Sequence, residues 1–122
     1  MRYMILETPG SANGRAERLY LMIAVSTFER MRGLLYRTAL GPRDGMLLPR
    51  CGLIHTFGAR YPIDVVYLDG DNRVLKVSRA LAPRRIGGHW RARTVLKLAA
   101  GSAAMCGVTV GCVLVLPAAG GQ

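Results

Sequence analysis

The spacing of apolar residues changes along the chain, from a helical period between residues 26 and 37 to a strand period after them. Between residues 26 and 37 the apolar side chains form one stripe through Phe28, Met31 and Leu34. The stretch opens with a capping box at Ser26–Glu29, in which each side chain can bond a backbone N–H that the first helical turn leaves unpaired. The pattern therefore predicts one main α-helix over about residues 26–37.

Short apolar or alternating segments make up most of the remaining chain. Bounded by glycine, proline and asparagine, such segments are typical of β-strands. They lie at residues 3–6, 18–25, 45–49, 53–57, 63–69, 73–79, 94–98 and 108–116. Gly70–Asn72 separates two of them and predicts a hairpin. One helix against so many short strands predicts an α+β fold, mainly β, in which a small, curled, partly closed β-barrel-like sheet carries the helix of residues 26–37.

The length of 122 residues fits one domain, so we expect residues 1–122 to fold as a unit with a flexible C-terminal tail at about 118–122. Residues 98–122 carry no charge, but several glycines and Pro117 interrupt them, so we expect no membrane span. The N-terminus lacks the apolar core of a signal peptide. The three cysteines form no C-x-x-C pair, which is typical of reduced thiols. We expect a cytoplasmic, monomeric protein.

The charge is strongly unbalanced, with 17 basic residues against 7 acids and a net charge of +10. A basic domain attracts phosphate-rich partners, but arginine, glycine and alanine are abundant along the whole chain, as a GC-rich genome would also produce. The stretch Arg79–Lys97 holds no acid and places Trp90 among its basic residues. Because a single aromatic offers little stacking, we expect only weak and non-specific nucleic-acid binding through this stretch.

Sequence motifs of common cofactor-dependent and metal-dependent enzymes are absent. The strings G-x-x-x-x-G-K-[ST], G-x-G-x-x-G, H-E-x-x-H and G-x-S-x-G do not occur. The two histidines and the cysteines show no paired ligand spacing. We therefore expect no cofactor and no metal.

Polar and titratable residues concentrate in the string H-T-F-G-A-R-Y-P-I-D at residues 55–64. His55 can change its charge near neutral pH, and Arg60 presents a planar fork suited to a carboxylate or a phosphate. Asp64 stands at the start of an apolar strand, where it needs a donor such as Arg30, Arg60 or backbone N–H groups. Three interpretations stay open: a structural network that pins helix to sheet, a ligand-binding corner, and an acid–base pair of His55 and Asp64 in a small enzyme.

Four strings together carry a resemblance to a known family. They are A-V-S-T-F-E-R-M-R-G-L-L-Y-R at 24–37, G-M-L-L at 45–48, I-H-T-F-G-A-R-Y-P-I-D-V-V-Y-L-D at 54–69 and V-L-K-L-A-A-G at 95–101. Over about residues 18–115 the chain resembles the family of domain of unknown function 192. The resemblance implies a compact, mainly β domain without an established activity. It places the polar signature of the family on Glu29, Arg30, Arg37, His55, Thr56, Arg60 and Asp64.

The chain departs from the family pattern at Lys97 and Cys112, where an acid is usual. The resemblance is to the branch with H-T-F-G, whose members lack signal peptides and are in some cases encoded beside pilus or secretion genes.

These observations favour a non-catalytic binding or assembly module. Its polar corner, the helix of 26–37 against residues 55–64, would hold a small anionic or sugar-like ligand or a protein partner. For this corner we expect Glu29 or Arg30 within hydrogen-bonding reach of residues 55–64. The alternatives are the small enzyme with His55 and Asp64, and the weak nucleic-acid binder through Arg79–Lys97.

Overall fold

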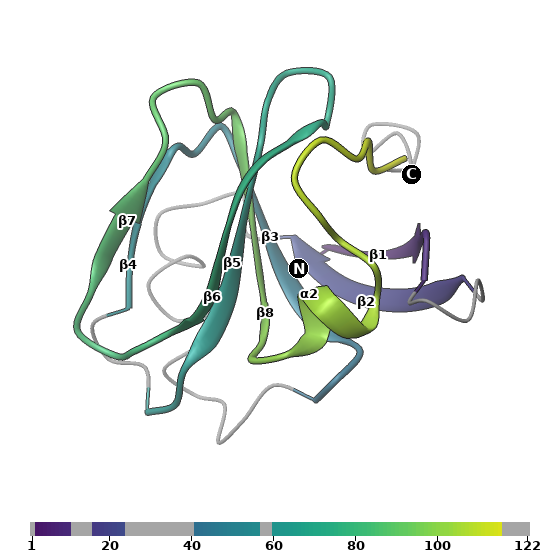
Figure 1. Ribbon diagram of the computed structural model, residues 1–122, viewed down its shortest axis with the longest axis horizontal. Coiled ribbons are helices and arrows are strands. Elements are labelled where there is room, and N and C mark those ends of the chain that lie inside the picture. The colour runs from purple at the N-terminus through teal and green to yellow at the C-terminus, as the bar shows by residue number, and fades with distance from the viewer. Residues whose placement is uncertain (1, 11–15, 24–40, 57–59, 116–122) are drawn as a thin grey trace.

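The computed structural model describes residues 2–10, 16–23, 41–56 and 60–115 (Figure 1). Its elements are the strands β1 (Arg2–Thr8), β2 (Glu17–Ile23), β3 (Asp44–Pro49), β4 (Leu53–His55), β5 (Ile63–Leu68), β6 (Val74–Leu81), β7 (Ile86–Gly88) and β8 (Thr94–Ala99), followed by the helix α2 (Ser102–Met105). The helix predicted over residues 26–37 lies outside the described residues. The prediction of a mainly β fold is confirmed.

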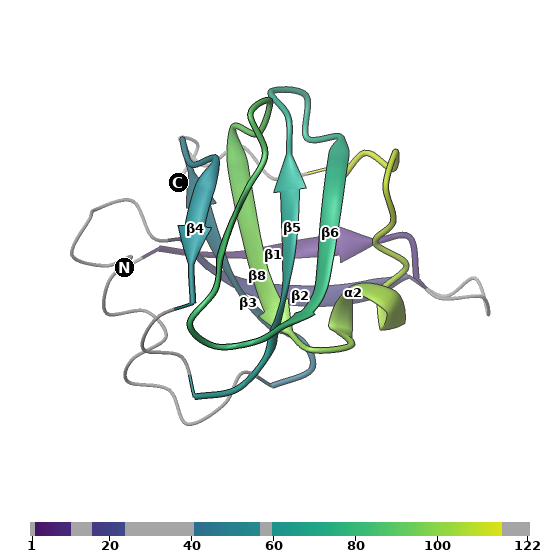
Figure 2. The ribbon, with the colours of Figure 1, turned by 60° about the vertical axis from the view of Figure 1, so that its left-hand side comes forward.

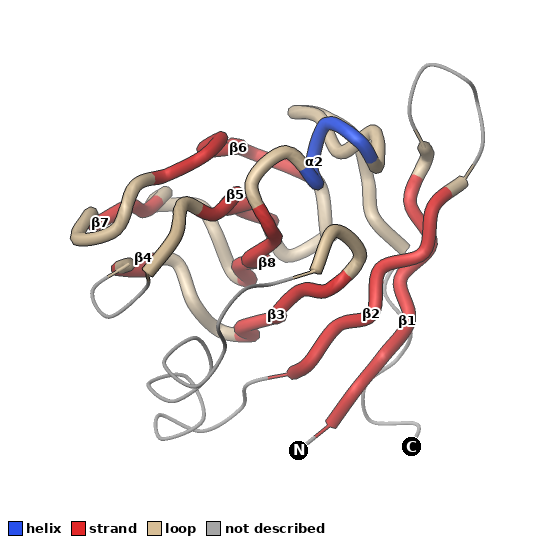
Figure 3. Tube along the Cα trace, turned by 90° about the horizontal axis from the view of Figure 1, so that it is seen from below, coloured by secondary structure: helices blue, strands red, loops and turns tan. Residues whose placement is uncertain are grey.

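The strands form two sheets. The larger sheet has the order β1-β2-β3-β8-β5-β6 and is antiparallel except where β2 pairs with β3. It curls without closing, so that β1 and β6 remain its edges (Figure 2). The smaller sheet pairs β4 with β7 antiparallel and lies to one side of the larger one (Figure 3). The curled sheet agrees with the barrel-like shape expected from the sequence.

The central strands β3, β8 and β5 of the large sheet are buried on both faces, which explains why they are almost continuously apolar. All six residues of β5 are buried, and alternate residues of β5 and β8 enter two different apolar clusters. The first cluster joins Val66 and Leu68 to side chains of α2 and the segment that follows it. The second joins Val65 and Tyr67 to Ile54 of β4. The β4–β7 sheet therefore covers one face, and α2 with residues 106–114 covers the other.

The hairpin predicted at Gly70–Asn72 is confirmed, because β5 and β6 pair antiparallel around it. Its turn is closed by Asp69, whose Oδ1 accepts the backbone N–H of Asp71 at 2.8 Å and of Arg73 at 3.0 Å. These two donors hold the pKa of Asp69 below its usual value. Asn72 takes the left-handed conformation with φ of 62°, which asparagine tolerates better than most residues.

The strand predicted over residues 108–116 is wrong for the part that the structure describes. Within the described residues, this segment forms one isolated antiparallel β-bridge, between Arg73 and Val113. Gly107 and Gly111 have φ of 71° and 94°, and these left-handed positions break the extended backbone that a strand needs. The segment instead runs irregularly over the first cluster, into which it buries Val108 and Leu114.

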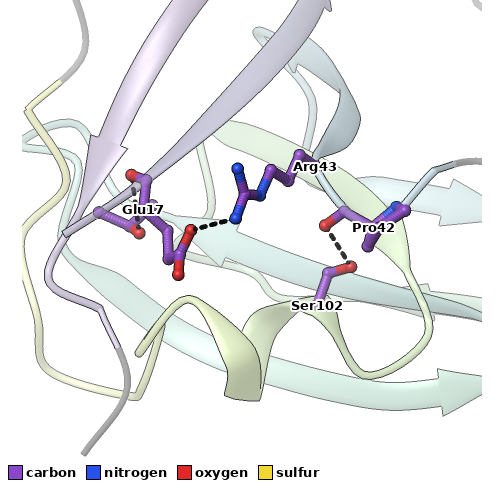
Figure 4. A network of polar contacts seen from close by, with 5 residues as sticks. Glu17, Pro42, Arg43 and Ser102 are labelled. Carbon is purple, nitrogen blue, oxygen red and sulfur yellow. Dashed lines mark hydrogen bonds and ion pairs between the residues drawn. The ribbon is translucent and has the colours of Figure 1, made fainter. Parts of the chain in front are cut away.

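The short helix α2 is held by contacts from distant parts of the chain. The Ser102 hydroxyl donates to the carbonyl of Pro42 at 2.9 Å (Figure 4). Next to it, Arg43 Nη2 lies 3.1 Å from Glu17 Oε2 and joins the segment before β3 to β2.

Within the described residues, no helix is both long and apolar enough to cross a membrane.

Candidate functional site

Within the described residues, Asp64 is held by backbone N–H groups. It is 1% exposed, and its two carboxylate oxygens accept the N–H groups of Ala80, Gly101 and Ala103 at 2.9–3.0 Å. Ala80 has φ of 48° at an irregularity of the β5–β6 ladder, where an N–H falls out of the regular pairing. Gly101 and Ala103 begin α2, which has no side-chain cap of its own. Of the donors considered from the sequence, the structure shows backbone N–H groups at Asp64, whereas Arg30 lies outside the described residues.

Thr56 is a second structural residue. It is 1% exposed, and its hydroxyl donates to the carbonyl of Ala82 at 2.7 Å and accepts the N–H of Arg85 at 2.8 Å. Its backbone also bonds with Arg85 and Arg84. Through these hydrogen bonds, Thr56 holds the connection between β6 and β7 against the end of β4.

Replacing Thr56 with valine is expected to lower the free energy of unfolding by about 1–3 kcal/mol. The shape is kept, but the carbonyl of Ala82 and the N–H of Arg85 lose their buried partner. Urea denaturation followed by circular dichroism measures the change. Thr109→Val, at an exposed position, is the matched control with little expected effect. Equal stability of both variants would show that the hydroxyl of Thr56 is free for another role.

The structure separates His55 from Asp64. Asp64 points to the face of the large sheet that α2 covers, whereas His55 is exposed on β4, which covers the opposite face. The two residues are separated because successive side chains of a strand point to opposite faces. Ile63 and Val65 face the β4–β7 sheet, so Asp64 between them faces the other way. Consequently, the acid–base pair considered from the sequence is not brought together. Arg60 is also exposed. Glu29, Arg30 and Arg37 lie outside the described residues, and so does their expected contact with residues 55–64.

The outer face of the β4–β7 sheet exposes large apolar side chains. Leu53 is 70% exposed, Ile86 67% and Trp90 85%. His55 lies opposite Ile86 in the register, and Leu53 lies opposite Gly88, so these side chains share one face. We call the surface formed by Leu53, His55, Ile86 and Trp90 the outer face. Strand β7 was not predicted, because a three-residue strand containing two glycines has no apolar alternation to reveal it.

Trp90 stands between two surface hollows. The first, of about 600 Å³, is lined by Gly52, Leu53, Gly88, His89, Trp90 and Ala92. The second, of about 490 Å³, is lined by Asp69, Gly70, Asp71, Trp90, Arg91 and Arg93. The Arg91 guanidinium lies 5.4 Å from the centre of the Trp90 ring, a cation–π contact that holds the indole beside a positive charge.

The surroundings of the outer face are basic. Arginines 60, 84, 85, 91 and 93 are all exposed. No acid follows Asp71 in the chain, and none lies between Asp44 and Asp64. Asp69 and Asp71 line the second hollow and are the acids that approach Trp90 among the described residues.

The sequence analysis placed Lys97 in the basic stretch Arg79–Lys97, as part of a possible nucleic-acid surface, but the structure buries its side chain. It is 6% exposed in the middle of β8, opposite Met46 of β3 and Val65 of β5. Burial lowers its pKa, and the Cys51 thiol acts in the opposite direction. The signal in the sequence is one lysine inside the apolar run T-V-L-K-L-A. A lysine in such a run also fits an exposed side chain on a half-buried strand, so the sequence does not show that Lys97 is buried.

Three free cysteines are present, with Cys106 buried and Cys51 and Cys112 half-buried. Burial raises the pKa of the Cys106 thiol. Among the described residues, no group of three or more His, Cys, Asp or Glu side chains is placed to hold a metal ion.

The fold and the outer face define a class: a small, mainly β domain in which a curled six-stranded sheet carries a two-stranded sheet with an exposed apolar surface. Residues 9–116 match the model of the DUF192 family, "Uncharacterized ACR, COG1430". The chain belongs to this family, as the resemblance implied. No curated protein matches the chain.

Two solved structures share this fold over nearly the whole chain. A protein from Sinorhizobium meliloti 1021, described as a "putative transcription regulator", is 25% identical with a TM-score of 0.79, over 95% of this chain and 96% of that one. A protein of unknown function from Novosphingobium aromaticivorans DSM 12444 is 21% identical with a TM-score of 0.78, over 93% of this chain and 84% of that one.

Proposed function

We propose that the protein is a non-catalytic binding module whose outer face docks an acidic segment of a partner protein that also carries apolar side chains. The observation that carries the proposal is the exposure of Leu53, Ile86 and Trp90 on one face. Large exposed apolar side chains that gather in one place are typical of interaction surfaces. Trp90 lies between the two hollows and is suited to anchor a partner. Aromatic side chains that become buried in an interface supply much of its binding energy.

The arginines around this face select the charge of the partner. They would attract an acidic segment and repel a basic one, which raises the association rate and excludes wrong partners. This proposal retains two residues of the polar corner, His55 and Arg60, and moves the binding surface away from Asp64 and Thr56.

A protein segment fits the surface better than a nucleic acid does. Leu53 and Ile86 are aliphatic and offer no stacking platform, which leaves the indole of Trp90 and the smaller imidazole of His55 as the rings of the outer face. The carboxylates of Asp69 and Asp71 line the second hollow and would repel a phosphate backbone there. In favour of nucleic acid stand the Arg91–Trp90 contact and the description of the Sinorhizobium meliloti protein as a "putative transcription regulator".

The test uses fluorescent peptides of defined pattern as probes, measured by anisotropy. A peptide of alternating glutamate and leucine is expected to bind about tenfold more tightly than alternating glutamate–serine or lysine–leucine peptides, because it alone matches both the charge and the apolar surface. The double variant Leu53→Ser, Trp90→Ser should lose at least tenfold in affinity. Val110→Ser is the matched control, since Val110 is 65% exposed on the other side of the fold.

A labelled single-stranded oligonucleotide distinguishes the nucleic-acid alternative in the same assay. We expect only weak binding, with a dissociation constant of about 10⁻⁴–10⁻⁶ M at physiological salt, unaffected by the double variant. Sub-micromolar binding that disappears in the double variant would overturn the proposal and assign the outer face to nucleic acid. Equal affinity for the three peptides would overturn it as well.

A further inference from the structure

Among the residues that the structure describes, one edge of β7 is open. The strand pairs with β4 on one side and with no other described strand, and it lies at the margin of the molecule (Figure 1). An edge strand presents backbone N–H and C=O groups that can pair with another extended chain. The backbone of β7 can therefore contribute to binding in addition to the side chains of the outer face.

The hydrogen bonds at the two ends of β7 show which of its residues face the open edge. The carbonyl of Arg85 accepts the N–H of Thr56 at 2.8 Å, and the N–H of His89 donates to the carbonyl of Gly52 at 3.0 Å. Backbone groups of successive residues in a strand point alternately to its two edges. The odd-numbered residues of this stretch therefore direct their N–H and C=O groups toward β4, and the even-numbered residues direct theirs away from it.

Ile86 and Gly88 are the two residues of β7 that face the open edge. Each offers one N–H and one C=O there. Gly87 and Gly88 have no side chains to shield the backbone, which is typical of a place where another backbone comes close. The strand also lacks lysine, proline and a bulge, which are features that commonly prevent pairing at a sheet edge. The edge is thus accessible to an added strand.

The two faces of β7 differ in character, and the difference selects the side chains of an added strand. On the outer face, Ile86 is 67% exposed and Leu53 is 70% exposed. Arg85 has the parity of Gly87, which faces the large sheet, and Arg85 is exposed at the start of β7. A strand added beside β7 places its alternate side chains on the same two faces. Apolar residues of that strand would contact Ile86, and acidic residues between them would lie on the side of Arg85.

We propose that the acidic and apolar partner segment binds as an added β-strand, paired through its main chain with the open edge of β7. This inference rests on the proposed function and adds the binding mode to it, because the partner is then an extended segment in which acidic and apolar residues alternate. Hydrogen bonds to Ile86 and Gly88 hold its backbone, and the two faces of β7 select its side chains. A helical segment, which repeats its apolar residues every three to four positions, does not match this edge.

The test uses the alternating glutamate–leucine peptide with N-methyl groups on either all leucines or all glutamates. In an extended strand the N–H groups of the leucines point to one edge and those of the glutamates point to the other, so only one set can face β7. We expect N-methylation of that set to weaken binding by at least about tenfold, because several main-chain hydrogen bonds are lost. N-methylation of the other set should change the affinity by less than about twofold. The sensitive set is the leucines if the strands pair antiparallel and the glutamates if they pair parallel.

Two protein variants test the same contact from the side of β7. Ile86→Pro removes an N–H that β4 does not use and places ring atoms at the open edge, whereas Ile86→Ala removes only the side chain. The proline variant should therefore bind the unmethylated peptide about tenfold more weakly than the alanine variant does. Circular dichroism shows whether both variants keep the fold, and the methylated peptides supply the test on the parent protein in either case.

The outcomes distinguish this inference from the proposed function. If the two methylated peptides lose affinity equally, or if neither loses any, the added strand is overturned, and selective binding of the unmethylated peptide then supports docking through side chains alone. If the unmethylated glutamate–leucine peptide binds no more tightly than the glutamate–serine and lysine–leucine peptides, the proposed function fails and the added strand fails with it.

Discussion

Replacing Asp64 with alanine is expected to lower the free energy of unfolding by about 3 kcal/mol or more, the largest loss among the substitutions considered. The carboxylate accepts three backbone N–H groups, and each buried donor left without a partner costs about 1–3 kcal/mol. The three donors belong to β6 and to the start of α2. The variant should therefore loosen the irregular end of β6 and the short helix together. Urea denaturation and amide hydrogen exchange of Ala80 and Ala103 measure both effects.

Two further variants sharpen this result. Asp64→Asn keeps one carbonyl oxygen but directs an NH₂ group at donors, so it should recover little of the lost stability. Asp71→Ala, at an exposed position in the hairpin turn, should change stability by no more than about 0.5 kcal/mol. If Asp64→Ala unfolds at the same urea concentration as the parent, the carboxylate does not hold α2 and is open to a functional role.

The role of Asp64 shows how far a sequence argument reaches. A carboxylate at the start of an apolar strand must have donors, and this much follows from the residue and its neighbours alone. Which donors it has depends on the fold. The helix α2 consists of four residues, S-A-A-M, in a stretch of small residues that predicts a turn as readily as a helix, and it bonds Asp64 across 37–39 residues of chain. Local patterns carry no information about such a distant contact.

The strands of the large sheet were predictable because packing and local pattern agree in them. In β5 and β8 the runs are apolar except at Asp64 and Lys97, and both faces are buried, as expected for central strands. In residues 108–115 the same composition misled the prediction. Val110, Val113 and Val115 are exposed there, so the apolar residues do not indicate two buried faces. Burial by a neighbouring element, rather than apolar content, decides whether such a run becomes a strand.

The site could be predicted only in part for a related reason. Alternation along β4 separates Ile54 and Thr56, which face inward, from His55, which faces outward, and the string H-T-F-G does not show which side carries function. The outer face further depends on Ile86 and Trp90, which reach β4 through a pairing about 30 residues away in sequence. Polar residues crowded in sequence were therefore dispersed in space, and the exposed apolar residues were brought together.

The position of Lys97 follows from the same alternation but escapes prediction for a different reason. When both faces of a strand are buried, the parity of a residue no longer distinguishes core from solvent. Lys97 lies between Leu96 and Leu98, which belong to the first cluster, and itself faces the second. A lysine between apolar clusters lowers the stability of the fold. Residues of this kind occur where function is retained at the expense of stability.

Replacing Lys97 with methionine is accordingly expected to raise the free energy of unfolding at pH 7 by about 1–3 kcal/mol. Methionine has a similar length and no charge, so the variant removes the desolvation cost of a charged side chain that is 6% exposed and keeps the packing. Lys76→Met, at an exposed lysine, should change stability by no more than about 0.5 kcal/mol. Urea denaturation of the parent and of both variants gives the comparison.

The pH dependence of this gain identifies its cause. Since the pKa of Lys97 is lowered in the folded protein from 10.5, the unfolded chain binds more protons in the window between the two values, and the parent becomes more stable as the pH rises through it. The cost of Lys97 is full below its folded pKa and disappears above 10.5, so the advantage of the methionine variant should shrink toward alkaline pH. Other alkaline groups, such as Tyr67 with its raised pKa, are present in both proteins and cancel in the difference. If Lys97→Met instead destabilises the protein at every pH, the amine has a partner that stabilises the fold, and desolvation is not the dominant effect of this lysine.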